Sequence, residues 1–195
     1  MATNIGNWFE NGNKVLDRTQ NLDSDGYLST SALTAEHGAG AIGVGGSITA
    51  PQTRRWTENG VIVTQIKFDI TGLKSSAGVN DVIGVGTVPA YIGRNVVATN
   101  GVVFKAELSC LEVPVGADLD IDIGTNSAGT IDWDEAGGSA KLINGASLAA
   151  GQTLANLVPA MTANDYYYLV SAGSTTGTYT GGQFVLTTYG HAALA

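Results

Sequence analysis

Charge of both signs is scarce in this chain of 195 residues, and positive charge is the scarcer. Charged residues make up 13% of the sequence, about half of the ~25% usual for a soluble domain. Acidic residues outnumber basic ones by 17 to 9, so the formal net charge is −8. Nucleic acids and anionic membrane surfaces are held chiefly by Lys and Arg. The composition therefore argues against nucleic acid and against a membrane as partners.

Cysteine and histidine are almost absent as well. The single cysteine, Cys110, excludes a disulfide within the chain and a zinc site built from several cysteines. Its neighbours Glu107 and Glu112 would not activate a thiolate, so we predict a small buried hydrophobic residue. His37 lies in a glycine-rich stretch and His191 in the C-terminal tail, outside any triad or metal pattern. We expect no enzyme activity, no metal and no cofactor.

Long apolar segments are also missing. No run approaches the ~20 residues of a membrane span. Residues 1–7 lack the basic start and apolar core of a signal peptide. We therefore expect a protein made in a cytoplasm without a standard export signal.

Glycine and apolar residues are what the chain does contain. There are 27 glycines, and 44% of the residues are hydrophobic, which together favour a turn-rich β protein. Residues 1–35 are polar and aperiodic, and predict an extended N-terminal arm. Residues 36–50 form a glycine-rich connector, and residues 51–195 form a single β domain.

Two Asn-Gly pairs predict hairpins. Asn59-Gly60 lies between strand-like residues 53–58 and 61–70, and Asn100-Gly101 lies between 91–99 and 102–113. Further strands are predicted at residues 118–123, 166–171 and 183–189, and two short strands with turns within 139–160. We expect an antiparallel β-sandwich, jelly-roll-like, with a core that includes Ile62, Ile66, Phe68, Phe104 and Leu108.

Two groups of acidic residues could carry chemistry. Asp118, Asp120 and Asp122 alternate with apolar residues, which predicts a solvated strand face with Leu119, Ile121 and Ile123 pointing inward. That face could also meet a metal or a basic partner. Asp132, Asp134 and Glu135 surround Trp133, and such a cluster could serve sugar hydrolysis. Acidic residues in a loop usually face water, so we favour a solvated loop.

Two other motifs fit a known pattern only in part. Residues 38–43 spell a dinucleotide-binding fingerprint, with Glu58 at a suitable distance, but neither a buried strand nor a helix flanks them. Asn21, Asp23 and Asp25 match the first ligands of a calcium loop, but Ala32 stands where the bidentate carboxylate belongs. We favour a flexible linker for the first motif and a turn stabilised by Asn and Asp side chains for the second.

Calcium should therefore not be required for stability. Adding a chelator should leave the melting temperature unchanged, because the strongest ligand of the candidate loop is missing. A loss of many degrees that calcium alone reverses would contradict this expectation.

Four residues are candidate partner contacts. Trp8 and Phe9 are large aromatics in a polar segment that has no local core, so we expect them to anchor the arm on another chain. Arg54 and Arg55 are the one adjacent basic pair, and predict either a solvated strand end or contacts to an acidic neighbour. The run Tyr166–Tyr168 predicts two tyrosines on one strand face and one on the other.

Five segments resemble structural proteins of tailed bacteriophages, especially marine ones. They are residues 66–75 (IKFDITGLKS), 80–84 (NDVIG), 101–114 (GVVFKAELSCLEVP), 166–170 (YYYLV) and 179–186 (YTGGQFVL). The resemblance implies a capsid decoration or cement protein of jelly-roll type. Such proteins commonly sit as homotrimers on the major capsid protein at the exterior of the virion.

Three functions follow as hypotheses. The first is a non-enzymatic virion protein that binds and stabilises the assembled capsid. The second is a carbohydrate-binding or host-adhesion module that uses Trp133 and exposed tyrosines. The third is a hydrolase that uses the acidic residues around Trp133, and it is the least favoured because no pair of buried acids has a predictable spacing.

Overall fold

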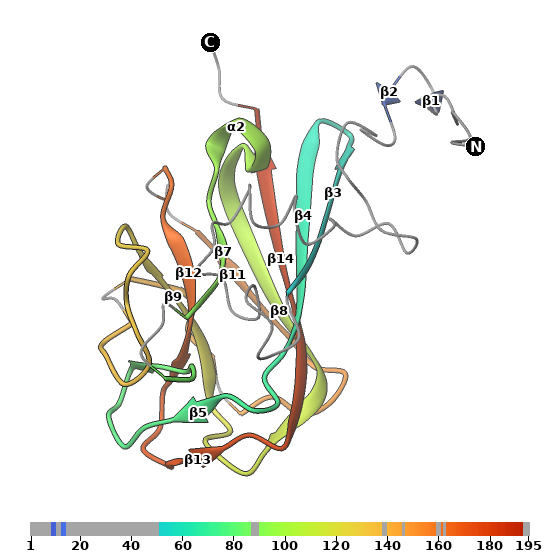
Figure 1. Cartoon of the computed structure of the whole chain (residues 1–195). Helices are drawn as coiled ribbons and strands as arrows, with labels where there is room; N and C mark the ends of the chain where they lie inside the picture. Colours follow the sequence, from blue (N-terminus) through green and yellow to red (C-terminus); the bar gives the residue numbers. More distant parts are fainter. Residues whose placement is uncertain are drawn as a thin grey trace, which may run out of the picture.

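Two antiparallel β-sheets packed face to face form the body of the protein in a computed structural model (Figure 1). The structure describes residues 9–10, 13–14, 51–86, 90–137, 140–145, 147–158, 161 and 163–192. Within these ranges no helix is long and apolar enough to cross a membrane. The predicted antiparallel β-sandwich is confirmed, whereas its jelly-roll form stays a prediction.

The first sheet, called the long sheet, has the strand order β11-β8-β14-β4-β3. Its strands are β3 (Gln52–Glu58), β4 (Val61–Asp69), β8 (Val102–Val115), β11 (Thr153–Leu157) and β14 (Gly181–His191). The last strand in chain order, β14, lies at the centre and pairs with both β4 and β8.

The second sheet, called the short sheet, has the order β10-β9-β12-β6, with β7 also paired to β12. Its strands are β6 (Asp81–Val82), β7 (Tyr91–Arg94), β9 (Ile121–Asn126), β10 (Ala140–Ile143) and β12 (Tyr166–Ser171). The remaining elements are β1 (Phe9–Glu10) paired with β2 (Asn13–Lys14), β5 (Lys74–Ser75) paired with β13 (Gly177–Thr178), and the one-turn helix α2 (Val97–Asn100). The short strands predicted within 139–160 are confirmed as β10 and β11.

The first predicted hairpin is confirmed. Glu58 pairs with Val61, and Asn59 and Gly60 have φ angles of 50° and 79°. Both positive values are what a two-residue type I′ turn requires.

The second predicted hairpin is wrong, because β7 and β8 belong to different sheets. The Asn100 N–H donates to Val96 O at 2.7 Å, and the Gly101 N–H donates to Val97 O at 2.9 Å. These bonds make a helical turn, α2, and Gly101 with φ 71° ends it. An Asn-Gly pair serves both turns equally well, since a left-handed glycine also terminates a helix.

One hydrophobic cluster joins the two sheets. Phe68 and Phe184 stack at its centre with ring centroids 5.7 Å apart. Ile66, Phe68 and Leu108 are buried as predicted, whereas Ile62 is half-buried. Cys110 is fully buried, and this burial raises the pKa of its thiol, as expected of a packing residue.

Phe104 is the exception, since its side chain is 39% exposed and its predicted place in the core is wrong. Tyr189 pairs with Lys105 but Gly190 pairs with Val103, so Phe104 is an extra residue in the β8 ladder. Such a bulge interrupts the alternation on which the prediction depended. The Phe104 ring lies beside the ring of His191, which ends β14 and does not lie in a tail (centroids 6.3 Å apart).

Candidate functional site

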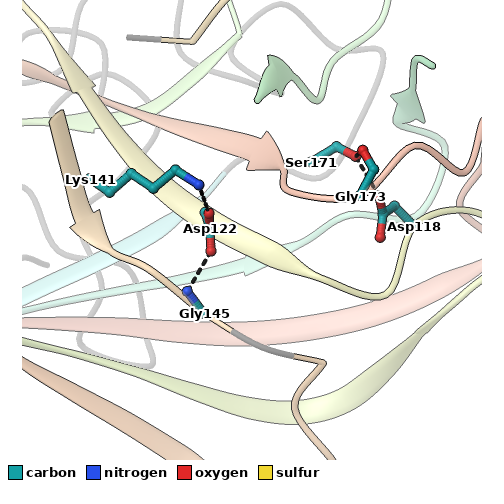
Figure 2. Close-up of polar contacts among 6 residues, drawn as sticks. All are labelled: Asp118, Asp122, Lys141, Gly145, Ser171 and Gly173. Carbon is teal, nitrogen blue, oxygen red and sulfur yellow. Dashed lines mark hydrogen bonds and ion pairs between the residues drawn. The ribbon is translucent and has the colours of Figure 1, made fainter. Parts of the chain in front are cut away.

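Asp122, on β9, is the most deeply buried acid among the described residues, with a side chain that is 0% exposed. Lys141 on β10 pairs with Gly124, two residues from Asp122 and on the same face of the sheet. The Lys141 ammonium contacts Asp122 Oδ2, and the Gly145 N–H donates to Oδ1 (Figure 2). Both carboxylate oxygens thus have a donor inside the protein.

The prediction of a solvated Asp122 is wrong because both faces of the short sheet are covered. The segment 127–137 folds over the outer face, where the Ile131 N–H donates to Tyr168 Oη at 3.4 Å. Tyr168 Oη in turn donates to the Ala128 carbonyl at 2.6 Å. Alternation therefore does not separate buried from exposed residues on β9, as is usual for a strand covered on both sides.

Asp118 is also buried, and Leu119 is 45% exposed, so both predictions are reversed. Ser171 Oγ donates to Asp118 Oδ2 at 2.7 Å (Figure 2). The Asp120 N–H donates to Asp118 Oδ1 at 3.0 Å. The bond to Asp120 makes an Asx turn, so β9 begins only at Ile121. The predicted strand thus started three residues too early, whereas Ile121 and Ile123 are buried as expected.

Asp120 is half-buried between these two acids. Its Oδ1 atom is buried and has no hydrogen-bond partner among the described residues. Burial raises the pKa of this carboxyl, Asp122 and Asp118 raise it further, and Lys141 lowers it. Asp118, Asp120, Asp122 and Lys141 are called the acid cluster below.

The acid cluster is held by donors from its own chain. Asp118 and Asp122 each accept two hydrogen bonds, which leaves their oxygens engaged with Ser171, Lys141 and backbone N–H groups. In the part of the chain that the structure describes, no three His, Cys, Asp or Glu residues are arranged to hold a metal ion. The geometry favours a structural or covalent role over a hydrolytic pair open to substrate.

The acids around Trp133 lie in a loop that runs beside β6, where the Val82 N–H donates to the Glu135 carbonyl at 2.8 Å. Asp134 and Glu135 are exposed, and Glu135 Oε2 accepts the Asp132 N–H at 3.1 Å. Trp133 is half-buried with Lys74 Nζ 5.7 Å from its ring centroid. Its indole is therefore partly covered, which weakens its case as a stacking surface for sugars.

The three consecutive tyrosines divide between two faces as predicted. Tyr167 and Tyr168 are buried, and Tyr166 is half-buried with its ring centroid 4.6 Å from that of Tyr91. Tyr91 also contacts Tyr168, so Tyr166 and Tyr168 share one face. None of the three is exposed as the adhesion hypothesis needed.

The structure describes the four predicted partner contacts to different extents. Trp8 lies outside the described residues, and so do Asn21, Asp23, Asp25 and the 38–43 motif. Phe9 opens β1, where only the backbone pairing with Lys14 is described. Arg54 is exposed, with its Nε atom donating to Gln65 Oε1 at 2.7 Å and its guanidinium 5.3 Å from the Trp56 ring centroid. Arg55 points to the other face of β3, where it is half-buried and donates to Thr64 Oγ1 at 3.1 Å.

A row of side chains crosses the outer face of the long sheet. The pairing places Trp56, Val63, Tyr189, Lys105 and Leu157 side by side on five strands. Lys105 Nζ lies 4.9 Å from the Tyr189 ring centroid and 2.7 Å from Glu107 Oε1. Tyr189 Oη donates to Glu107 Oε2 at 2.7 Å. These bonds from Lys105 and Tyr189 lower the pKa of Glu107 and fix the polar middle of the face.

Exposed large hydrophobic side chains gather on β8 and its neighbour β11. Seven are present in the described residues, and only Val79 and Leu119 lie on other segments. The remaining five are called the β8–β11 strip: Phe104, Leu111, Val113, Val115 and Leu157. Sequence reasoning missed this strip because it placed Phe104 in the core and assigned no face to the other four residues. A faint signal was present, since Leu111, Val113 and Val115 alternate out of step with Ala106, Leu108 and Cys110.

Comparisons with known proteins add no assignment. No protein-family model matches the chain, and neither a curated protein nor a solved structure is significantly similar to it.

Proposed function

We propose that this protein is a non-enzymatic virion component that binds the assembled capsid of a tailed bacteriophage and stabilises it from outside. The observation that carries the proposal is the β8–β11 strip, with Leu157 80% exposed at one end and Val115 53% exposed at the other. Phe104 and Leu157 form one group and Leu111, Val113 and Val115 a second, with Lys105, Glu107 and Ser109 between them on β8. Single exposed apolar residues are ordinary, but five on two paired strands favour a contact surface.

Two further features support docking on a protein. The apolar strip adjoins a polar row in which Lys105, Glu107 and Tyr189 hold one another, and such polar surroundings are usual around an interface. The net charge of −8 disfavours the packaged DNA as the partner. The resemblance of residues 66–75 and 101–114 to phage structural proteins selects the major capsid protein among protein partners.

Stabilisation needs no active site in this mechanism. A protein that binds only the assembled shell shifts the equilibrium toward that shell by mass action. The resemblance implies a homotrimer on the capsid exterior and a jelly-roll form of the sandwich. The anchoring of the 1–35 arm through Trp8 and Phe9 is a separate proposal, drawn from the composition of that segment.

The test is attachment of purified variants to particles that lack this protein. The double variant Leu157→Lys, Val113→Lys places two charges in the strip, and we expect at least ~10-fold weaker attachment. Val79→Lys is the matched control, because Val79 is 59% exposed on a segment outside the strip, and it should attach as the unaltered protein does.

Both variants should have the same melting temperature as the unaltered protein, since the altered side chains are solvent-exposed. Unchanged attachment of the strip variant would refute the docking surface. Equal heat resistance of particles with and without the bound protein would refute the stabilising role.

An adhesion module remains a second candidate because Trp56 and Tyr189 share the outer face of the long sheet. Aromatic rings on a flat sheet can stack on sugar rings. This function predicts glycan binding that Trp56→Ala abolishes while the Leu157→Lys, Val113→Lys variant retains it. The reverse pattern, with no glycan bound and particle attachment lost in the strip variant, supports decoration.

A further inference from the structure

In the acid cluster, the amine of Lys141 contacts the carboxyl of Asp122, and the Asp122 carboxyl is shielded from water. The Asp122 side chain is 0% exposed, and the Lys141 side chain is 26% exposed. Two strands, β9 and β10, carry the pair, so the reacting groups are held by backbone pairing and not by a mobile loop. Groups held in this way react as if at very high local concentration.

From this arrangement we infer that Lys141 and Asp122 condense into an isopeptide bond that ties β10 to β9. One proton first passes from the Lys141 ammonium to Asp122 Oδ2, which it contacts, and the Nζ lone pair that this frees attacks Asp122 Cγ and forms the C–N bond. A second Nζ proton then passes to Oδ2, the Cγ–Oδ2 bond breaks, and Oδ2 leaves as water. An ammonium and a carboxylate thus become one amide and one water molecule, with no oxidant, cofactor or second substrate.

Gly145 supplies the stabilisation that the tetrahedral intermediate needs. Its N–H already donates to Asp122 Oδ1, the oxygen that would carry the negative charge after attack, while Lys141 contacts the other oxygen (Figure 2). A donor aimed at the developing charge is the usual device for acyl chemistry. A side chain at position 145 would crowd this point, because its Cβ would lie 2.9 Å from the Ile121 carbonyl and 3.1 Å from Asp122 Oδ1.

Asp120 lies beside the pair and reports how dry the site is. Its Oδ1 lies 3.5 Å from the point where a Gly145 Cβ would be, and Asp122 Oδ1 lies 3.1 Å from the same point. Burial, and then the carboxylates of Asp122 and Asp118, raise the pKa of Asp120. The same poor solvation favours the neutral amine and carboxylic acid of the pair over the two charged forms.

The surface pair Lys105–Glu107 provides an internal contrast. Its Nζ–Oε1 distance is 2.7 Å, but both side chains are in contact with solvent, at 36% and 23% exposure. Water stabilises the two charged forms there, and no second acid stands beside them with a raised pKa. We therefore expect that pair to stay ionic.

Mass spectrometry of the denatured, full-length protein tests the inference directly. The unaltered chain should be lighter by one water molecule, and peptide mapping should find the Lys141 and Asp122 peptides joined. Lys141→Arg keeps the positive charge but has no nucleophilic amine, and should restore the full mass.

Lys105→Arg is the matched control and should still lose the water. A full mass in the unaltered protein after long incubation in the folded state would overturn the inference. So would a water loss that persists in Lys141→Arg, because it would then come from elsewhere, such as a cyclised Asp25-Gly26 pair. The unaltered protein alone decides the question if a variant fails to fold, and the result is independent of capsid binding.

Discussion

Lys141→Met should lower the free energy of unfolding by about 3–5 kcal/mol. The substitution removes the ammonium from Asp122, whose carboxylate is fully buried and would keep only the Gly145 N–H as a donor. The cost arises in the variant, where the buried Asp122 charge has no cation beside it, and it is present whether the unaltered Lys141 and Asp122 are an ion pair or an amide. Urea denaturation followed by circular dichroism at neutral pH measures the loss.

A double variant separates this cost from the value of the pair. Lys141→Met combined with Asp122→Leu removes the uncompensated charge and should recover the part of the loss that this charge causes, while the part that comes from the missing cross-link should remain. The matched single-site control is Lys67→Met, on the outer face of β4, where a loss within about 0.5 kcal/mol is expected. A loss below about 1 kcal/mol for Lys141→Met would show that water reaches Asp122 after all.

Phe184→Ala should cost about 3–5 kcal/mol, the usual range for removing a buried aromatic ring. Phe184 is 1% exposed on the central strand β14, and its ring stacks on Phe68 at 5.7 Å between the two sheets. Neither sheet can close over the space left behind, because β14 is fixed by β4 on one side and β8 on the other.

Phe104→Ala is the control for this prediction, since it removes the same ring from the bulge on β8. At 39% exposure, with a stacked His191 as its ring neighbour, Phe104 should contribute less than about 1 kcal/mol. The two variants compared in the same denaturation experiment therefore report where the core lies. Equal losses would contradict the bulge and would place Phe104 in the core.

Most of the fold could be predicted from local pattern. The Asn59-Gly60 turn, the inward face of Ile66 and Phe68, and the strand at residues 166–171 all depend on neighbours in sequence. Alternation and turn chemistry are local properties, so one sequence is enough to detect them.

The errors came from features that depend on distant segments. The bulge at Phe104 is defined by how β8 pairs with β14, which lies some eighty residues further along the chain. Asp122 is buried where Lys141 and Gly145 contact its carboxylate, and no pattern around residue 122 predicts these contacts from residues some twenty positions away. The Asn100-Gly101 pair has the same letters in a hairpin and at a helix end, and only the sheet assignment of β7 decides between them.

The candidate site was found only in part. The sequence singled out Asp118, Asp120 and Asp122, but as a solvated face, because period-2 patterns assume that a strand has one wet side. Lys141 and Gly145 were not connected to them, since they come from a turn-rich stretch with no motif of its own. Arg54 lies exposed as a contact residue should, while Arg55 is turned toward Thr64.

The central position of β14 has a consequence for biosynthesis. During translation, β3–β4 and β8–β11 emerge as separate two-stranded units, each with an open edge, before residues 181–191 leave the ribosome. The strand that joins them arrives after every other described strand, so the long sheet cannot close until then. Pairing between strands that are distant in sequence slows folding, and until it occurs the unpaired strand edges can associate with other chains. Ribosome-bound chains that stop before residue 181 should therefore be sensitive to proteases and inclined to aggregate, and high-level expression should benefit from slow synthesis at low temperature.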